Sequence, residues 1–293
     1  MNKGFYTALG TPLDRDGNFM ADSMTRQIRQ QIDAGVSGVL VMGSMGNMTY
    51  LKNSEYPKVA ACAAEAAKGQ VPVLVGVTDL SIGRVMDRVA ALEGIQGIDG
   101  IVSTVPYYST MDQNGIFTFY NEIANRADKQ VYLYDLAVVT KAATAPATVR
   151  KLWKNDNIKG IKSGNLVTQR ILHRAEDRPA DFTMMFSNID EFDIAYKYGI
   201  DKNLDGMFAC TPKTARKMYD ALEMGDYAAA GKALDDILAL RDLFLATPCL
   251  MMAFSHAMNL LGCEGCFGND YHTDISDDDK VRVTEAMKAL GEI

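Results

Sequence analysis

Eight short apolar runs alternate along the chain with eight segments that have a helical pattern. The runs cover residues 4–11, 38–43, 71–77, 100–105, 131–136, 158–162, 182–187 and 204–209. The helical segments cover residues 20–34, 54–68, 82–93, 115–127, 145–153, 166–175, 190–198 and 211–223. Neighbouring parallel strands cannot be joined by a tight turn and need crossover connections, which are usually helices. The alternation therefore predicts an α/β fold with parallel strands.

The number of units and the composition of the strands favour a closed barrel. Eight β/α units are typical of a (β/α)8 TIM barrel rather than an open doubly wound sheet. The runs are nearly all apolar, as expected for strands that are buried on both faces. After Gly225 the strand pattern stops, and residues 227–244, 248–261 and 276–290 are predicted to be helices, the last capped by Ser276. We expect a catalytic barrel domain of residues 1–225 and a C-terminal helical extension, residues 226–293, packed on it.

Charge and composition exclude several classes of partner. Lys and Arg number 30 and Asp and Glu number 37, so the net charge of −7 disfavours general binding of nucleic acid or acidic membranes. Apolar stretches such as residues 38–42 are far shorter than the roughly 20 residues of a membrane span. Asp14 and Asp16 lie where a secretion signal would be apolar, and five cysteines is an odd number. We therefore expect a cytoplasmic protein with reduced thiols.

Lys162 is the unusual residue of the predicted barrel. In such barrels the active site lies at the C-terminal ends of the strands. Strand alternation puts Lys162, the last residue of the sixth run, on the inner side, with Lys159 and Ile161 facing the helices. Loss of water inside a barrel disfavours the ammonium form, and a neutral amine can form a Schiff base with a carbonyl. The spacing is equally compatible with a structural role, in which Lys162 pairs with a carboxylate or lies at the rim of the barrel.

Two further features point to chemistry near this lysine. Tyr134 is expected on the adjacent strand at the same level, where a phenol can shuttle protons; a barrel-filling aromatic residue is the alternative. Gly43 and Gly46 bound a short loop after the second run. Glycines permit close backbone approach, so N–H groups of this loop can hold a carboxylate or phosphate, although an ordinary tight turn has the same pattern.

Other signals for a cofactor or a metal are weak. The chain has neither a Walker phosphate loop nor a G-x-G-x-x-G dinucleotide motif. None of the three histidines, His173, His256 and His272, falls at a strand end. Cys263 and Cys266 form one C-x-x-C pair, whereas a closed zinc site needs four ligands. We expect no cofactor and no metal.

The motifs together resemble the dihydrodipicolinate synthase / N-acetylneuraminate lyase family of class I, Schiff-base-forming aldolases. They fall in order along most of the chain: Gly43-Ser44-x-Gly46, Val105-Pro106-Tyr107-Tyr108, Tyr132-Leu133-Tyr134-Asp135, Gly160-Ile161-Lys162 and Asn188-x-Asp190-Glu191. Each motif is weak by itself, but the ordered set, with Tyr134 28 residues before Lys162, is specific.

The resemblance implies pyruvate chemistry. By similarity, Lys162 forms the Schiff base with a 2-oxo acid and Tyr134 transfers the proton at the C4 oxygen. The N–H groups of Ser44 and Met45, with the Ser44 hydroxyl, bind the carboxylate of the 2-oxo acid. Tyr108 belongs to a proton relay that crosses a subunit interface, because members of the family are commonly homotetramers built as dimers of dimers.

The chain departs from the family pattern in its carboxylate loop. Met45 and Asn47 replace a Thr and a Glu there. This motivates the alternative of a catalytically impaired relative that binds a 2-oxo acid. The synthase branch carries an arginine five residues after the tyrosine, for a second substrate carboxylate. Here that position is Val139, and Lys141 is the only nearby substitute, without the bidentate fork of an arginine.

Other positions resemble the lyase branch more closely. Asp190 and Glu191 match an acidic pair that binds sugar hydroxyls in that branch. Gly164 and Cys210, by contrast, depart from that branch, which has a Thr and a Ser at these positions of its substrate site, so the resemblance does not single out sialic acid itself. We therefore expect a lyase for a hydroxylated 2-oxo acid, of the N-acetylneuraminate or 2-oxo-3-deoxy sugar-acid type, with dihydrodipicolinate synthase as the alternative.

Overall fold

The eight strands of the chain close into a parallel barrel in sequence order. The computed structural model describes all residues, 1–293, and each strand pairs with the next, β8 returning to β1. The bounds are β1 Gly4–Ala8, β2 Gly38–Val41, β3 Val73–Gly76, β4 Gly100–Thr104, β5 Val131–Asp135, β6 Ile158–Ser163, β7 Thr183–Phe186 and β8 Lys202–Asp205. The expected (β/α)8 TIM barrel is confirmed.

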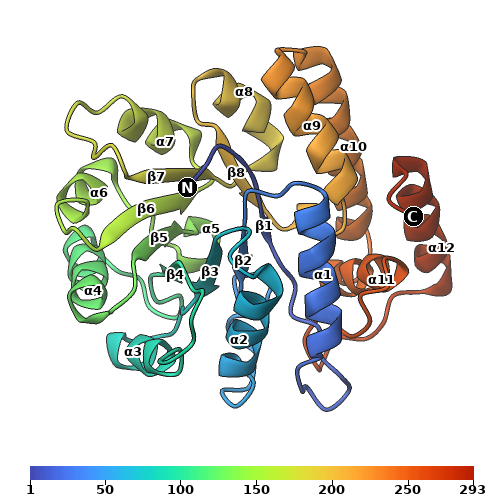
Figure 1. Cartoon of the computed structure of the whole chain (residues 1–293), viewed down its shortest axis with the longest axis horizontal. Coiled ribbons are helices and arrows are strands. Elements are labelled where there is room, and N and C mark those ends of the chain that lie inside the picture. Colours follow the sequence, from blue (N-terminus) through green and yellow to red (C-terminus); the bar gives the residue numbers. More distant parts are fainter.

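Helices surround this barrel on its outside, as Figure 1 shows. The helices that connect successive strands are α1 Ala21–Asp33, α2 Tyr56–Ala67, α3 Ile82–Ala90, α4 Gln113–Arg126, α6 Pro146–Leu152, α7 Leu166–His173 and α8 Phe192–Lys197, and α9 Pro212–Met224 follows β8. Each of these agrees with an expected helical segment to within a few residues.

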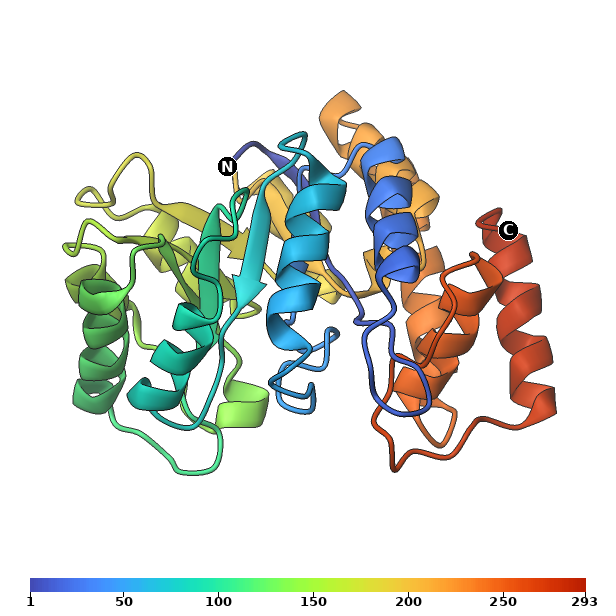
Figure 2. The same ribbon diagram turned by 60° about the horizontal axis from the view of Figure 1, so that its bottom comes forward.

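Three helices follow the last β/α unit and gather at one side of the molecule, next to α1 (Figure 2). They are α10 Tyr227–Leu245, α11 Leu250–Leu260 and α12 Asp277–Leu290. The Glu292 carboxylate accepts hydrogen bonds from the N–H of Thr214 (2.8 Å) and of Lys213 (3.2 Å), and so caps α9. The Ser276 cap is confirmed by its hydrogen bond from the N–H of Asp279, 3.1 Å. The division at residue 225 stays a prediction about folding units.

Strand alternation divides the apolar side chains into two layers. An inner cluster fills the barrel, and a larger cluster lies between the strands and the helices. The inner cluster consists of Tyr6, Ala8, Leu40, Leu74, Val102, Tyr132, Tyr134, Met185 and Leu204. These side chains fill the interior of the barrel. The space that a ligand can enter therefore lies at the C-terminal ends of the strands.

The eighth strand differs from its expected position. We expected residues 204–209, but the strand covers Lys202–Asp205 and is followed by the 3-10 turn η2, Met207–Ala209. The Asp205 carboxylate accepts a hydrogen bond from the N–H of Met207 at 2.8 Å, which turns the backbone out of the strand. Two short elements were also not expected as such: α5 Ala137–Thr140 and the 3-10 turn η1 Ile189–Glu191 before α8.

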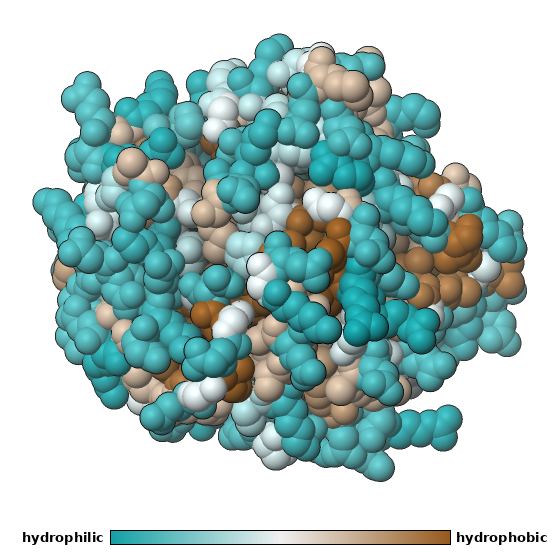
Figure 3. Space-filling view, viewed as in Figure 1, coloured by the Kyte–Doolittle hydropathy of each residue, from teal (hydrophilic) through white to brown (hydrophobic).

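The face of the molecule seen in Figure 3 is largely hydrophilic, with apolar side chains gathered in separate patches. None of the helices combines the length and the apolar character needed to cross a membrane.

Candidate active site

A cavity of about 250 Å³ opens at the C-terminal ends of the barrel strands. Strands β1, β2, β5, β6, β7 and β8, or the loops that follow them, contribute to its wall, and α10 and α11 close one side. The lining residues are Ala8, Leu40, Ser44, Met45, Tyr134, Lys162, Ser187, Leu204, Asp205, Gly206, Met207, Arg241 and Leu250.

Lys162 lies inside the barrel as the alternation predicts. It pairs in register with Tyr134 of β5 and Met185 of β7, and only 8% of the residue is exposed. Its Nζ atom lies 3.8 Å from the centre of the Tyr134 ring. Lys159 points away from the cavity and pairs with Asp181 at 2.5 Å. The placement of the lysine and the tyrosine side by side at one level is therefore confirmed.

The loop after β2 brings a hydroxyl and two free amides to the same cavity. Ser44 Oγ lies 3.1 Å from the Tyr134 hydroxyl, so the two groups share a hydrogen bond. The N–H groups of Ser44 and Met45 have no hydrogen-bond acceptor within the chain. Backbone N–H groups that remain unpaired beside a cavity can donate hydrogen bonds to an anionic ligand.

Close backbone contacts fix this loop. A Cβ atom on Gly46 would lie 2.6 Å from the backbone nitrogen of Met42, so only glycine fits there. The Thr11 hydroxyl donates to the Gly46 carbonyl at 2.7 Å. Asn47 adopts a left-handed conformation, φ 57°, and its Nδ2 donates to the Phe267 carbonyl at 3.0 Å. The asparagine thus holds the loop through a neutral hydrogen bond.

Met45 forms part of the cavity wall by packing against the end of β8. A Cβ atom on Gly206 would lie 2.2 Å from Met45 Cγ, so the absence of a side chain at Gly206 makes room for the methionine. The thioether makes this wall of the cavity apolar.

The part of the cavity wall that β8 and α10 form contains two charged residues, Asp205 and Arg241, that the sequence analysis did not single out. Asp205 ends β8, and burial raises the pKa of its carboxyl although the Met207 N–H and the charges of Lys162 and Arg241 oppose this shift. Arg241 extends from α10 and pairs with Asp190 at 2.5 Å and with Asp242 at 2.9 Å. A polar residue at the end of a strand was a signal for Asp205, but no pattern marked Arg241.

Other residues assigned to substrate binding lie outside this cavity lining. Asp190 reaches the site only through Arg241, whose hydrogen bond lowers the pKa of the Asp190 carboxyl. Glu191 and Gly164 are partly exposed and do not line the cavity. Cys210 is fully buried in the layer between strands and helices, where its thiol contacts the Met207 carbonyl at 3.3 Å.

Three further positions that the sequence analysis discussed, Tyr108, Val139 and Lys141, are exposed. Tyr108 is 88% exposed and does not reach the cavity of its own chain. Val139 is 46% exposed on α5. The Lys141 ammonium donates to the Val138 carbonyl at 2.7 Å and is absent from the cavity lining. The structure therefore supplies a cation at the cavity from α10 and not from Lys141.

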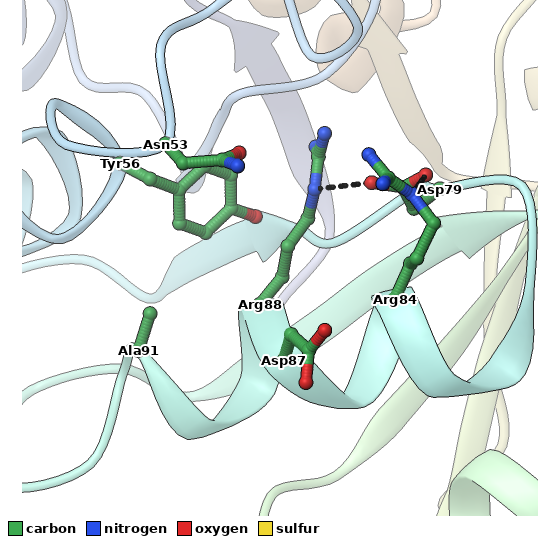
Figure 4. Close-up of a pocket in the computed structure, with 7 residues that line it drawn as sticks. All are labelled: Asn53, Tyr56, Asp79, Arg84, Asp87, Arg88 and Ala91. Atoms are coloured by element: carbon green, nitrogen blue, oxygen red, sulfur yellow. Dashed lines mark hydrogen bonds and ion pairs between the residues drawn. The ribbon is translucent and has the colours of Figure 1, made fainter.

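A second hollow, of about 150 Å³, lies outside the barrel between α2 and α3 (Figure 4). Asp79 pairs there with Arg84 at 2.5 Å and with Arg88 at 3.1 Å. Burial raises the pKa of the Asp79 carboxyl, but the Arg84 hydrogen bond and the two positive charges outweigh burial and lower it. The Tyr56 hydroxyl donates to the Gly76 carbonyl. Because the charged groups pair with one another and the phenol bonds to the backbone, the hollow is a structural contact between helices rather than a reactive centre.

The C-x-x-C pair does not assemble a cluster. Cys263 is buried against Gln30, and Cys266 contacts Met252. No group of three or more His, Cys, Asp or Glu side chains has a geometry that would hold a metal ion.

Sequence comparison relates this chain to known proteins over nearly its whole length. The profile of the dihydrodipicolinate synthetase family matches residues 1–289. A 4-hydroxy-tetrahydrodipicolinate synthase of Ligilactobacillus salivarius is 27% identical over 251 residues, 84% of this chain and 85% of the relative. An N-acetylneuraminate lyase of Clostridium perfringens is 27% identical over 233 residues, 78% of this chain and 79% of the relative.

Solved structures share the fold. The dihydrodipicolinate synthase of Thermotoga maritima superimposes with a TM-score of 0.89 at 21% identity, covering 100% of both chains. The sialic acid aldolase of Ruminococcus gnavus gives a TM-score of 0.90 at 19% identity and covers 99% of this chain and 97% of its own. Synthases and lyases are thus similar to this chain to the same degree.

Proposed function

The chain belongs to the dihydrodipicolinate synthetase family, whose members are pyruvate-dependent lyases and synthases, and on that basis we propose that it cleaves or forms the C3–C4 bond of a hydroxylated 2-oxo acid through a Schiff base on Lys162. One observation carries the proposal: Lys162, Tyr134 and Ser44 meet in one cavity, at the catalytic end of the barrel. The substrate class is that of 2-oxo-3-deoxy sugar acids and N-acetylneuraminate.

The first step joins the lysine to the substrate. The unprotonated amine of Lys162 attacks C2 of the 2-oxo acid, and loss of water leaves an iminium ion. The positive nitrogen then draws the electrons of the C3–C4 bond, so that cleavage gives an enamine and releases an aldehyde. Protonation at C3 and hydrolysis free pyruvate and restore Lys162. The reverse sequence joins pyruvate to the aldehyde.

Tyr134 moves the proton that this cleavage requires. The C4 hydroxyl loses its proton as the bond to C3 breaks, and the Tyr134 oxygen receives it while the phenol's own proton passes to Ser44 Oγ. Ser44, at 3.1 Å from the tyrosine hydroxyl, passes the proton onward. Tyr134 is 5% exposed, so this exchange is sheltered from bulk water.

The loop after β2 holds the carboxylate of the 2-oxo acid. The N–H groups of Ser44 and Met45 are free to donate, and the Ser44 hydroxyl adds a third donor. Donors that are fixed before the substrate arrives need no reorganisation during reaction. Replacement of the family's threonine by Met45 keeps the amide, so the carboxylate retains its backbone contacts.

Tyr108 completes the relay only when a second copy of the chain is present. Its side chain is 88% exposed and contributes nothing to the cavity of its own chain. We infer that it enters the site of a neighbouring subunit, in the homotetrameric assembly that the family resemblance implies.

Reductive trapping tests the Schiff base. Borohydride added with pyruvate should inactivate the protein and leave a pyruvyl-derived mass on the peptide that contains Lys162. Lys162→Met should abolish the adduct, whereas Lys159→Met, on the same strand but paired with Asp181 outside the cavity, should leave it intact. An adduct on another lysine, or turnover of a 2-oxo acid without any adduct, would contradict this mechanism.

A panel of 2-oxo-3-deoxy sugar acids, assayed for release of pyruvate, tests the substrate class. A synthase is the second candidate, because it needs a cation for the carboxylate of aspartate semialdehyde and Arg241 is a cation at the cavity, although Asp190 and Asp242 already pair with it. Efficient condensation of pyruvate with aspartate semialdehyde, without cleavage of any sugar acid, would select the synthase. A protein that traps pyruvate but turns over neither class is the impaired relative.

A further inference from the structure

The cavity presents four titratable side chains, and only one of them is a carboxylate. The four are Tyr134, Lys162, Asp205 and Arg241. The proposed mechanism uses the tyrosine and the lysine and leaves the aspartate and the arginine without a role. These two residues form the wall contributed by β8 and α10.

Asp205 lines the cavity at the end of β8, and one oxygen of its carboxylate has no donor within the chain. Its Oδ1 accepts the N–H of Met207 at 2.8 Å, which fixes the orientation of the carboxylate. No donor of the chain bonds to Oδ2. Along the barrel, Tyr134 of β5 lies on one side of Lys162 and Asp205 of β8 lies on the other, beyond β7. Tyr134, Lys162 and the Ser44 loop take up the substrate as far as C4, so the part of the substrate beyond C4 is free to lie against Asp205.

Arg241 is held in a fixed position beside this aspartate. Its Nη1 donates to Asp190 at 2.5 Å, and its Nε and Nη2 donate to one oxygen of Asp242 at 3.2 and 2.9 Å. A guanidinium has five N–H donors, so two remain for a ligand. The side chain is 24% exposed, so α10 and its partners restrict its motion.

The charges around this wall favour neutral hydroxyl groups over a second anion. The Arg241 guanidinium already faces the carboxylates of Asp190 and Asp242, and Asp205 adds a negative charge at the same cavity. An additional carboxylate would be repelled by these three groups. A hydroxyl carries no charge, donates to Asp205 Oδ2 and accepts from a free N–H of Arg241.

We propose that Asp205 and Arg241 bind the hydroxyl groups of the aldehyde-derived half of the substrate, and that Asp190 positions Arg241 instead of contacting the substrate itself. The inference rests on the proposed aldolase function and assigns its substrate a neutral, polyhydroxylated tail. It moves the hydroxyl-binding role from the loop after β7 to the wall formed by β8 and α10.

Condensation of pyruvate with three aldehydes tests this assignment. Glyceraldehyde carries hydroxyls, acetaldehyde carries none, and glyoxylate carries a carboxylate. The kcat/KM of the wild type should be highest with glyceraldehyde. A site that pairs hydroxyls disfavours an analogue that lacks them, because its own polar groups are left unpaired.

Substitutions at the wall should remove this preference. Asp205→Asn and Arg241→Gln should each lower kcat/KM with glyceraldehyde about 10- to 100-fold, the usual size of a hydrogen bond to a charged group. The loss with acetaldehyde should be at least tenfold smaller. Asp236→Asn, on the same helix as Arg241 but paired only with Lys232, is the matched control and should keep the wild-type preference.

Asp190 requires a separate readout because it acts through Arg241. Asp190→Asn should raise KM for glyceraldehyde and leave KM for pyruvate and the melting temperature near their wild-type values. Asp190→Glu should restore part of the affinity, since it keeps a carboxylate for the guanidinium. A merely structural role would change both KM values and the melting temperature together.

The controls separate this inference from the proposed function. Failure of the wild type to trap pyruvate on Lys162 would remove the proposed function. If trapping succeeds, a wild type that prefers glyoxylate or acetaldehyde overturns the inference, as does an unchanged preference in Asp205→Asn and Arg241→Gln. Should one of these two variants not fold, as judged by circular dichroism, the other decides.

Discussion

Gly46 provides a direct test of how the carboxylate loop is held. In the substitution Gly46→Ala, the new Cβ would lie 2.6 Å from the nitrogen and 2.8 Å from the Cα of Met42, and 3.0 Å from the Leu9 carbonyl oxygen. All three atoms belong to the backbone, so no side-chain rotation relieves the contact. The loop must shift by about 0.8 Å to reach an ordinary separation of 3.4 Å.

The size of the effect follows from this shift. Overpacking of this kind costs about 1–3 kcal/mol, which corresponds to a melting temperature roughly 2–10 °C lower in a chain of this length. The same displacement shifts Ser44 relative to Tyr134; the hydroxyl oxygens of these two residues are 3.1 Å apart in the native loop. A misplacement of about 1 Å costs on the order of 100-fold in rate.

Two measurements and one matched variant check this prediction. Thermal unfolding followed by circular dichroism gives the melting temperature, and pyruvate release gives kcat/KM. Gly231→Ala is the control, because Gly231 lies within α10 with no atom within 4 Å of a new Cβ. It should keep full activity and gain up to about 1 kcal/mol from its higher helix propensity. Wild-type stability and activity in Gly46→Ala would refute the reasoning.

Three further predictions concern assembly, acid stability and the C-terminus. Tyr108→Phe and Tyr134→Phe should each be inactive, and mixing the two after subunit exchange should restore part of the activity; no recovery would show that each site is self-contained. Folding lowers the pKa of the Asp79 carboxyl. The ionised carboxylate therefore contributes fully to the free energy of unfolding above its unfolded pKa of about 3.9, and this contribution is lost as pH falls through the lower pKa of the folded protein. The melting temperature of Asp79→Asn should therefore lie below that of the wild type at pH 7, and the difference should begin to shrink as the pH falls below about 4; a constant difference would contradict the pairing. Glu292→Ala should cost about 1–3 kcal/mol by uncapping α9, whereas Glu285→Ala, exposed on α12, should change the free energy of unfolding by less than about 0.5 kcal/mol.

The site residues that follow strand periodicity were predictable from the sequence. Lys162 and Tyr134 lie on adjacent strands, and inner and outer positions alternate along each strand. This local rule places both side chains inside the barrel without knowledge of the rest of the fold. The Ser44 loop was predictable for a similar reason, since glycines mark a close backbone approach.

Residues that depend on the path of loops were not predictable in this way. The sequence suggested that residues 204–209 continue a strand, but the bond from Met207 N–H to Asp205 ends it early and directs the following turn. Cys210 consequently lies in the helix layer and not at the cavity. Side-chain-to-backbone bonds of this kind compete with strand pairing, and apolar periodicity does not detect them.

The sequence by itself determined the barrel, its order of strands and the lysine–tyrosine pair, because these follow from repeating local patterns in which each residue's face depends on its neighbours. Only the tertiary structure decided the wall opposite Tyr134. Arg241 is 79 residues after Lys162 and belongs to a helix outside the β/α repeat, so its arrival at the cavity depends on how α10 packs against the barrel. Its pairing with Asp190 likewise joins residues 51 positions apart, and no local pattern encodes a contact at that separation.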